Sequence, residues 1–224
     1  LHLSIRRQRP DVYKRQDSLD NNSGTIRDPA LNNAVLTHVA VDNNSGYIVD
    51  TAPPTVSSVE ITSAAGIENS FLNAGDNVSV TATFSELVNV DNSSGNPRIT
   101  LAVGSDNRSA AYTSGDNSTE LVFQYTIQAG DNDSNGISIR ADSLDNNSGS
   151  IRDPALNNAI LTHSAVDNNS GYKVDTTPPS VDSFTISDTL LTIGETATVT
   201  LEFSVAVIEF SSADDITVPN GSLS

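Results

Sequence analysis

Residues 77–84 read Asn-Val-Ser-Val-Thr-Ala-Thr-Phe, and every second residue is apolar. In an extended segment Val78, Val80, Ala82 and Phe84 share one face, whereas the side chains between them are polar. An apolar residue at every second position indicates a β-strand that is buried on one side. The stretch therefore predicts a half-buried strand, and it sets the fold class for the residues around it.

The same alternation returns on both sides of this stretch. Clusters of Asn, Asp, Gly and Ser separate the alternating segments, and these residues favour turns. Seven or so short strands in about 120 residues, with no convincing helical period, predict an all-β, immunoglobulin-like sandwich. The further predicted strands contain Val56, Val59 and Ile61; Ile99, Leu101 and Val103; Ser109–Thr113; Leu121, Phe123, Tyr125 and Ile127; Ile137, Ile139 and Ala141; and Ile160–Val166 with Tyr172–Val174.

A long stretch of the sequence occurs twice. Residues 17–54 return at 142–179, an offset of 125, and 33 of the 38 positions are identical. This period exceeds the ~20–50 residues of solenoid repeats and matches one whole domain. The sequence therefore predicts tandem modules: the C-terminal part of one at 17–54, a complete one at 55–179 and the N-terminal part of a third at 180–224. Such a pattern is expected of a piece of a longer reading frame.

The predicted modules are joined by proline pairs. The joints read Val-Asp-Thr-Ala-Pro-Pro at 49–54 and Val-Asp-Thr-Thr-Pro-Pro at 174–179. Proline fixes the backbone φ angle, so a Pro-Pro pair makes a short and stiff connector. The third module repeats the pattern of the second, since residues 194–204 match residues 75–85.

The charge of the chain is strongly uneven. Residues 1–16 carry five of its 11 basic residues and one of its 28 acidic residues, which leaves a net charge of −21 on the remainder. Because residues 11–16 (DVYKRQ) resemble a translated sequencing adapter, we expect 1–16 to lie outside the fold. The alternative is a basic N-terminal arm. The acidic remainder repels nucleic acid and anionic membranes, and no stretch approaches the ~18–20 apolar residues of a membrane span.

Several motifs carry a family resemblance. Nearly all of residues 17–224 resembles the bacterial Ig-like repeats of very large secreted or surface-anchored proteins, including adhesins and motility-associated surface proteins. The resemblance implies a β-sandwich, a role in an extended stalk, and neighbouring modules of the same chain as partners. The DNNSG insertions depart from the tighter loops of the family. The motifs are VDTTPPSV at 174–181, GDNVSVTATFSE at 75–86, NPRITLAV at 96–103, FQYTIQAGDNDSNGISI at 123–139 and IRDPALNNA at 151–159.

One loop has the spacing of a calcium site. Asp131, Asp133 and Asn135 occupy positions 1, 3 and 5, Gly136 occupies position 6, and Asp142 falls at position 12. Calcium prefers six to eight oxygen ligands, and this is the ligand spacing of an EF-hand loop, here with Asp at position 12 in place of Glu and without flanking helices. The alternative is a polar β-turn between two strands, and the sequence leaves both interpretations open.

The position of this loop favours a cation. The turn after the fifth strand of a seven-strand sandwich lies at the end where the chain leaves the module. We expect Glu68, Asp76 and the joint residue Asp175 at the same end, as weaker candidate ligands. Carboxylates on the two sides of a Pro-Pro joint would repel one another unless a cation neutralised them.

The DNNSG motif recurs through the chain. It starts at Asp20, Asp42, Asp145 and Asp167, with the variant DNSSG at Asp91. We interpret these motifs as Asx-turns ending in a glycine with a left-handed backbone, with weak cation binding as the alternative. The Asn-x-Ser/Thr sequons, for example at Asn117, are expected by coincidence in a chain so rich in Asn and Ser.

The sequence offers no constellation for catalysis. His38 and His163 occupy the same repeat position and are predicted to be surface strand residues rather than general bases. Neither a phosphate-binding loop nor a zinc motif is present, and the absence of Cys excludes disulfides and thiolate metal sites. A glycosidase needs paired carboxylates in a cleft lined by aromatic residues, and the chain has no Trp. We therefore expect no enzymatic activity in residues 17–224.

These observations together predict a structural spacer. We expect a segment of a secreted or cell-surface bacterial protein that projects a terminal domain away from the cell, with calcium as candidate cofactor at the joints. The alternative is a carbohydrate-binding module or an accessory repeat region of an extracellular enzyme. Sugar binding would need exposed aromatic platforms, for which the candidates are Tyr47, Tyr112 and Tyr172. The sequence identifies neither the terminal ligand nor the anchor.

Overall fold

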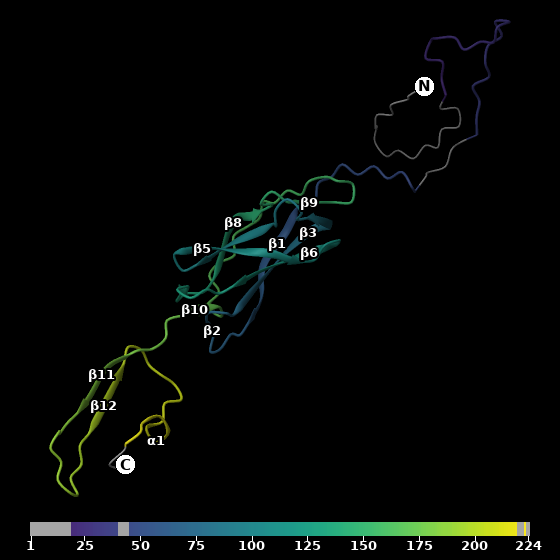
Figure 1. Ribbon diagram of the computed structural model, residues 1–224. Helices are drawn as coiled ribbons and strands as arrows, with labels where there is room; N and C mark the ends of the chain where they lie inside the picture. Colours follow the sequence, from purple (N-terminus) through teal and green to yellow (C-terminus); the bar gives the residue numbers. More distant parts are fainter. Residues whose placement is uncertain (1–18, 40–44, 219–221, 223–224) are drawn as a thin grey trace. The chain divides into compact units, whose positions relative to one another are not determined.

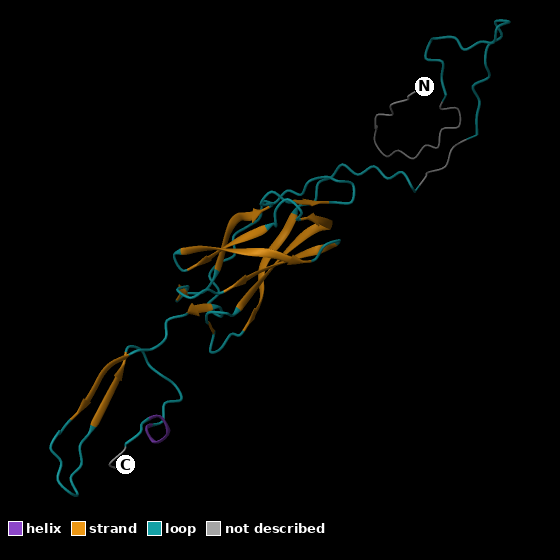
Figure 2. Cartoon of the chain, in the orientation of Figure 1, coloured by secondary structure: helices purple, strands orange, loops and turns teal. Residues whose placement is uncertain are grey.

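The structure is a computed structural model that describes residues 19–39, 45–218 and 222 (Figure 1). The chain divides into two compact units, residues 1–50 and 51–224. Its regular structure is almost entirely β, and α1 (Ser212–Asp215) is a single helical turn (Figure 2). The predicted all-β fold is therefore confirmed. The predicted module boundaries stay predictions, and residues 1–16 lie outside the described residues.

Seven strands of the second unit belong to one sheet. Their order is β1-β3-β6-β5-β4-β8, and β9 pairs with the C-terminal part of β3. All of these neighbours are antiparallel. The strands are β1 (Val56–Ala65), β3 (Asn77–Asp91), β4 (Arg98–Val103), β5 (Asp106–Ser114), β6 (Ser118–Thr126), β8 (Ser138–Asp145) and β9 (Ser150–Arg152).

The inward faces of β3 and β6 form the centre of the core. Val78, Val80 and Ala82 are fully buried, and the polar residues between them are half-buried. Val78 pairs with Tyr125 and Val80 pairs with Phe123, so the apolar residues of the two strands lie opposite each other. Full burial of one large apolar side chain is worth about 1.5–3 kcal/mol. A slip by one residue would turn this whole row to solvent, so the apolar row fixes the register.

Two smaller sheets contain the remaining strands of the second unit's described residues. In the first, β10 (Lys173–Asp175) lies between β2 (Phe71–Leu72), to which it is parallel, and β7 (Asn132–Asp133), to which it is antiparallel. This sheet binds the last residues of the module to the loops at its exit end. The second is an antiparallel pair of β11 (Val181–Ile186) and β12 (Val199–Phe203).

Strand β8 departs from the predicted alternation at Asp142. Ile139 and Leu144 are buried on the inward face, whereas Ala141 is exposed. Asp142 has a positive φ of 56°, and the register between β4 and β8 shifts at this point. An irregularity of this kind adds residues to one strand and turns the side chains that follow it. The inward placement predicted for Ala141 was therefore wrong.

Residues 160–166 follow the outer edge of β8 without a continuous ladder. Val166 and Ile139 exchange two main-chain hydrogen bonds of 2.7 and 2.9 Å, and the Asp142 N–H donates to the His163 carbonyl at 3.2 Å. At its start the segment meets β1 through a parallel bridge between Ile160 and Thr55. The strand predicted at Ile160–Val166 was therefore wrong, because the structure has only isolated bridges at the two ends of this segment and no regular ladder between them.

The repeated motif IRDPALNNA keeps its local geometry in both copies. In the first copy the main-chain N–H and the Nδ2 of Asn32 both donate to the Asp28 carboxylate at 2.8 Å. In the second copy Asn157 donates to Asp153 in the same way, at 2.8 and 2.7 Å. Asp28 is exposed and Asp153 is fully buried, so the surroundings of the two copies differ. Because the hydrogen bonds persist, the local sequence sets the shape of this loop.

Candidate functional site

Asp131, the first residue of the predicted calcium loop, has no exposed surface. Its Oδ1 accepts a hydrogen bond from Arg108 Nε at 2.6 Å, and its Oδ2 accepts from the Tyr125 hydroxyl at 2.5 Å and the Gln128 N–H at 2.9 Å. Burial acts to raise the pKa of Asp131, but the hydrogen bonds from Tyr125, Gln128 and Arg108 outweigh it, and the pKa is lowered. The carboxylate therefore anchors the loop to β5 and β6 as an ionised group.

Asp133 shapes the turn that follows. Its Oδ1 accepts hydrogen bonds from the N–H groups of Gly136 at 2.8 Å and Asn135 at 3.2 Å. Its Oδ2 accepts the N–H of Gly104, in the turn between β4 and β5, at 2.8 Å. Gly136 has a φ of 98°, a left-handed conformation that favours glycine. The polar-turn interpretation is thus a sufficient account of why Asp and Gly stand at these positions.

The structure does not gather the predicted calcium ligands into one cluster. Asp142 lies in the irregular part of β8, where its Oδ1 accepts the His163 N–H at 2.9 Å. Among the described residues, the carboxylates of Asp131, Asp133 and Asp142 do not form a group of the kind that could hold a metal ion. Calcium binding by the 131–142 loop stays a prediction.

The weaker candidate ligands lie at the exit end, as expected, and each serves a local turn or strand. Asp175 pairs with Asn132 across β10 and β7, which places the joint directly beside the 131–136 loop. The Oδ2 of Asp76 accepts the Asn73 N–H at 2.6 Å. Glu68 is exposed and lies in the turn before β2. Proximity at this end of the module therefore does not produce a shared carboxylate cluster.

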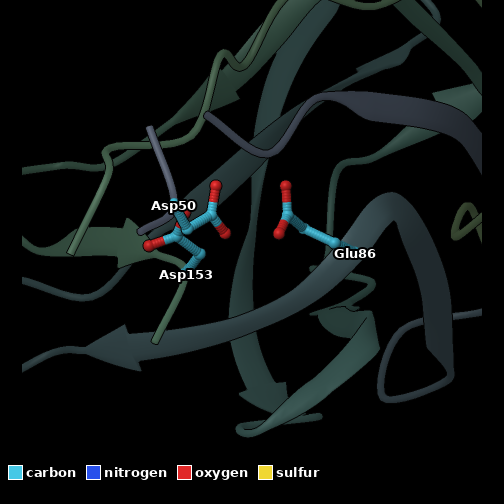
Figure 3. A group of neighbouring side chains, drawn as sticks. All are labelled: Asp50, Glu86 and Asp153. Atoms are coloured by element: carbon cyan, nitrogen blue, oxygen red, sulfur yellow. The ribbon is translucent and has the colours of Figure 1, made fainter. Parts of the chain in front are cut away.

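A different group of carboxylates comes together where the chain enters the module. One carboxylate oxygen each of Glu86 and Asp153 lies within 4.8 Å of the other, and Figure 3 draws these two side chains together with that of Asp50, the last residue before the second unit. Glu86 follows the core residue Phe84 on β3, and Asp153 follows β9. Two carboxylates at this spacing can contribute oxygen ligands to a hard divalent cation such as Ca²⁺.

Sequence reasoning missed this group, although one signal was present. Asp50 belongs to the repeated joint, and Asp153 belongs to the repeated IRDPALNNA motif. Glu86 lies about 70 residues from Asp153 in the chain, and no spacing rule links the two. Only the antiparallel pairing of β9 with β3 brings their strands side by side.

His163 is a structural residue of the outer segment, which we define as residues 160–166 along the edge of β8. Its Nε2 accepts hydrogen bonds from the N–H groups of Ser143 at 2.9 Å and Leu144 at 3.3 Å, and its Nδ1 lies 2.7 Å from the Ser164 carbonyl. The ring therefore carries its proton on Nδ1. The Ser143 hydroxyl lies 3.4 Å from Nε2, but that nitrogen already accepts two main-chain donors and is not placed to act as a general base.

The DNNSG motifs form Asx-turns, as predicted. The N–H of Asn147 donates to Asp145 Oδ1 at 2.9 Å, and the first copy has the equivalent bond to Asp20 at 3.1 Å. In the DNSSG variant Asp91 accepts the N–H two residues later, at 3.0 Å. The motif at Asp167 differs, because Asn169 Oδ1 accepts the Gly171 N–H instead. The motif that starts at Asp42 begins outside the described residues.

The role expected for the motif glycines was wrong. The left-handed residues of the 145–149 motif are Asn147 and Ser148, with φ of 46° and 71°, not the glycine. Gly149 is required for another reason, since a Cβ there would lie 2.3 Å from the Gly95 carbonyl oxygen. A Cβ on Gly95 would lie 1.8 Å from the Asn147 oxygen. The two motifs therefore interlock through glycine backbones that approach too closely for a side chain.

The aromatic residues do not make an open platform within the module. Tyr112 is half-buried and packs edge-on against Phe123, with ring centroids 5.9 Å apart. Tyr172 is half-buried against the core. Tyr47, its equivalent in the first copy, is 82% exposed. Tyr112 and Tyr172, the candidate sugar-binding residues of the complete module, therefore pack against the core.

The comparisons with known proteins agree with this picture. Residues 175–224 match the family model of a bacterial Ig-like domain. No curated protein and no solved structure matches the chain. The matched stretch begins at the joint residue Asp175 and includes β11, β12 and α1. Residues 175–224 are therefore similar to a bacterial Ig-like domain. In the part of the chain that the structure describes, no helix is long and apolar enough to cross a membrane.

Proposed function

We propose that this chain is a spacer segment of a large secreted or cell-surface bacterial protein of the adhesin type. Bacterial Ig-like domains are usually found outside the cell or on its surface, and they are non-catalytic modules. A chain of such modules would hold a terminal binding or catalytic domain at a distance from its anchor. The partners of each module would be its neighbours in the same chain.

The observation that carries the proposal is the path of the chain through the complete module. The chain enters beside the Thr55–Ile160 bridge, at the start of β1. It leaves through β10, which is bonded to β2 and β7, beyond the far end of β1. The entrance and the exit therefore lie at opposite ends of the strands, so each repeat adds its length to the array. The near-identical 38-residue copies and their Pro-Pro joints fit such an array.

Calcium at the module entrance would stiffen the array. In support, Glu86 and Asp153 lie within 4.8 Å of each other through their carboxylate oxygens. The alternative site is the 131–142 loop, but there the Asp131 and Asp133 oxygens already accept three hydrogen bonds each. A cation at that loop would have to displace several of these bonds. We therefore favour the entrance carboxylates.

Calorimetry separates the two calcium sites. Calcium that binds the native state alone raises stability by about 2.7 kcal/mol at a hundredfold excess over its dissociation constant, and extracellular modules typically bind at about 10⁻⁴–10⁻³ M. We expect millimolar calcium to raise the melting temperature relative to EDTA, and Glu86→Gln to remove this difference. Asp133→Ala should keep the difference while lowering the melting temperature in EDTA. The reverse result would assign calcium to the exit loop, and no shift in any variant would exclude calcium stiffening.

Small-angle scattering tests the spacer function. Chains with one, two and three complete modules should increase in maximum dimension by the same amount for each added module. Compact particles, in which the maximum dimension hardly grows from two modules to three, would contradict the proposal. A glycan-binding screen of the same chains addresses the carbohydrate-binding alternative, for which half-buried Tyr112 and Tyr172 offer little support.

A further inference from the structure

The large sheet does not close on itself. Its first strand, β1, pairs with β3 on one edge, and on the other edge it meets residues 160–166 at the bridge between Thr55 and Ile160. Beyond this bridge β1 and the segment 162–170 are separated by two successive cavities of about 630 and 450 Å³. The first is lined by Val56–Val59 and the second by Glu60 and Ile61, so they follow one another along the same strand. We call this groove the seam.

Both sides of the seam present main-chain groups. On one side, the ladder of β1 in the described chain runs to β3 alone, so its other edge is unpaired beyond Thr55. On the other side, the main-chain bonds to β8 use His163 and Val166, and the intervening residue Ala165 makes no main-chain hydrogen bond in the described structure. An unpaired edge of this kind is a template for an added strand.

The length of the seam suits a short extended peptide. It runs along six residues of β1, from Val56 to Ile61. At about 3.3 Å per residue this corresponds to roughly 20 Å, the length of a typical strand of five or six residues. The seam begins next to the Thr55–Ile160 bridge, where the two edges are already paired. A segment added here would extend the sheet from β1 and connect it with the outer segment.

The side chains that line the seam are acidic and small. Glu60, Asp142 and Asp167 are its charged residues, and neither Lys nor Arg lines either cavity. The remaining titratable residue is His163, whose Nε2 accepts two main-chain hydrogen bonds. Because the formal net charge of the chain is also −17, electrostatic attraction favours a basic segment.

We propose that the seam is a β-strand addition site for an extended, basic peptide segment of a partner protein. Main-chain hydrogen bonds to the two edges supply the binding, and Glu60, Asp142 and Asp167 select for Lys or Arg at alternate positions. A second copy of this chain is disfavoured as the occupant, because edge-to-edge pairing would bring two acidic seams together.

The experiment uses the full chain and a blocked hexapeptide, Lys-Val-Lys-Val-Lys-Val, as the probe. We expect saturable binding by fluorescence anisotropy that weakens as salt is raised. Amide exchange at Thr162 and Ala165 should slow in the presence of the peptide, since strand addition pairs this edge. A peptide with the same sequence but alternate amide nitrogens methylated should not bind. Binding that leaves these amides unprotected, or that survives methylation, would overturn the proposal.

Two variants provide the matched control. Glu60 on β1 and Glu120 on β6 are both exposed and both lie opposite a threonine of β3. Glu60→Lys should weaken binding of the basic peptide at least tenfold, and Glu120→Lys should leave it within twofold. If the two substitutions weakened binding equally, the peptide would be attracted to the acidic surface in general and not to the seam, and the proposal would fail.

The same experiment tests whether something other than a partner peptide occupies the seam. If sedimentation shows a dimer that the peptide dissociates, the seam belongs to a second copy of the chain, and the proposal fails. If deleting residues 1–16 raises the peptide affinity, the basic N-terminal residues of the chain itself occupy the seam, which also overturns it. We expect a monomer with an affinity that does not depend on residues 1–16.

Discussion

Arg108 and Asp131 form an ion pair in which Nε and Oδ1 are 2.6 Å apart and the carboxylate has no exposed surface. The same guanidinium contacts Asp106 through Nη2 at 3.1 Å, and the Asp106 side chain is 53% exposed. One arginine thus makes a buried and an exposed ion pair. The buried pair ties the 131–136 loop, which pairs with the next joint through β7 and β10, to the body of the module.

The buried pair should contribute far more to stability than the exposed one. Removing one partner of a buried pair leaves an uncompensated charge and typically costs about 3–5 kcal/mol. We expect Asp131→Asn to lower the free energy of unfolding by about 3 kcal/mol in urea titrations. Asp106→Asn, which removes the exposed partner of the same arginine, should cost less than about 1 kcal/mol. Similar losses in both variants would contradict this assignment.

Asp131 should also make the module sensitive to acid. Although burial opposes it, the hydrogen bonds from Tyr125, Gln128 and Arg108 lower the pKa of Asp131 below its ordinary value of 3.8. A group whose pKa is lowered on folding stabilises the protein above its unfolded pKa, and this contribution is lost as the pH falls through the folded pKa. Unfolding free energies measured from pH 5 to pH 2 should fall below about pH 4. In Asp131→Asn the free energy of unfolding should fall less steeply with decreasing pH. The same steepness in the variant and the original protein would count against the prediction.

Tyr125 should produce a corresponding loss of stability in alkali. Burial, followed by the hydrogen bond to Asp131, raises the pKa of Tyr125 to about 12 from 10.0. A raised pKa means that the neutral phenol stabilises the fold below the unfolded pKa, and that this contribution is lost as the pH rises from 10 toward 12. The phenolate absorbance of Tyr125 should therefore appear about two pH units higher than that of a tyrosine with the ordinary pKa of 10.0. In Tyr125→Phe the decline of stability in this window should be smaller, and an identical decline would refute the assignment.

The interlocked glycines make a prediction with an internal control. A Cβ on Gly149 would lie 2.3 Å from the Gly95 oxygen and 2.8 Å from the Asp91 oxygen. Overpacking of this kind typically costs about 1–3 kcal/mol, and we expect Gly149→Ala to lie in that range by chemical denaturation. Gly24 holds the same motif position in the first copy, where the nearest atom to a Cβ is the Asn21 oxygen at 3.0 Å. Because Gly24 lies in the first unit, Gly24→Ala should change the free energy of unfolding of the second unit by less than about 0.5 kcal/mol. It should also leave the hydrogen bond from the residue 24 N–H to the Asn21 carbonyl in place, as measured by amide exchange. Loss of protection at that amide would show that the motif needs glycine for its own turn.

The sequence predicted those parts of the fold that repeat a local pattern. The alternating residues of β3 and β6 are buried as expected, because a period of two is a local property that burial on one face preserves. The Asx-turns of the DNNSG motifs were predictable for the same reason, since donor and acceptor lie two residues apart.

Contacts between distant segments were not predictable. The positive φ of Asp142 shifts the register of β8, and no residue near it signals this. Asp131 has the spacing of a calcium ligand, but the strands bring Arg108 and Tyr125 to its oxygens. Glu86 approaches Asp153 only because β9 pairs with β3. Each of these features depends on strand pairing, which a single sequence specifies only through the complete fold.

The central claim is that each module adds length because its entrance and exit lie at opposite ends. The chain contains no Cys, so Thr51→Cys and Thr177→Cys provide two unique sites for spin labels across the complete module. Ten residues of β1 alone span about 33 Å, and pulsed electron paramagnetic resonance should give one narrow distance distribution above roughly 30 Å. A broad distribution, or a peak below about 20 Å, would mean that the joints are not held at opposite ends, and it would contradict the spacer function.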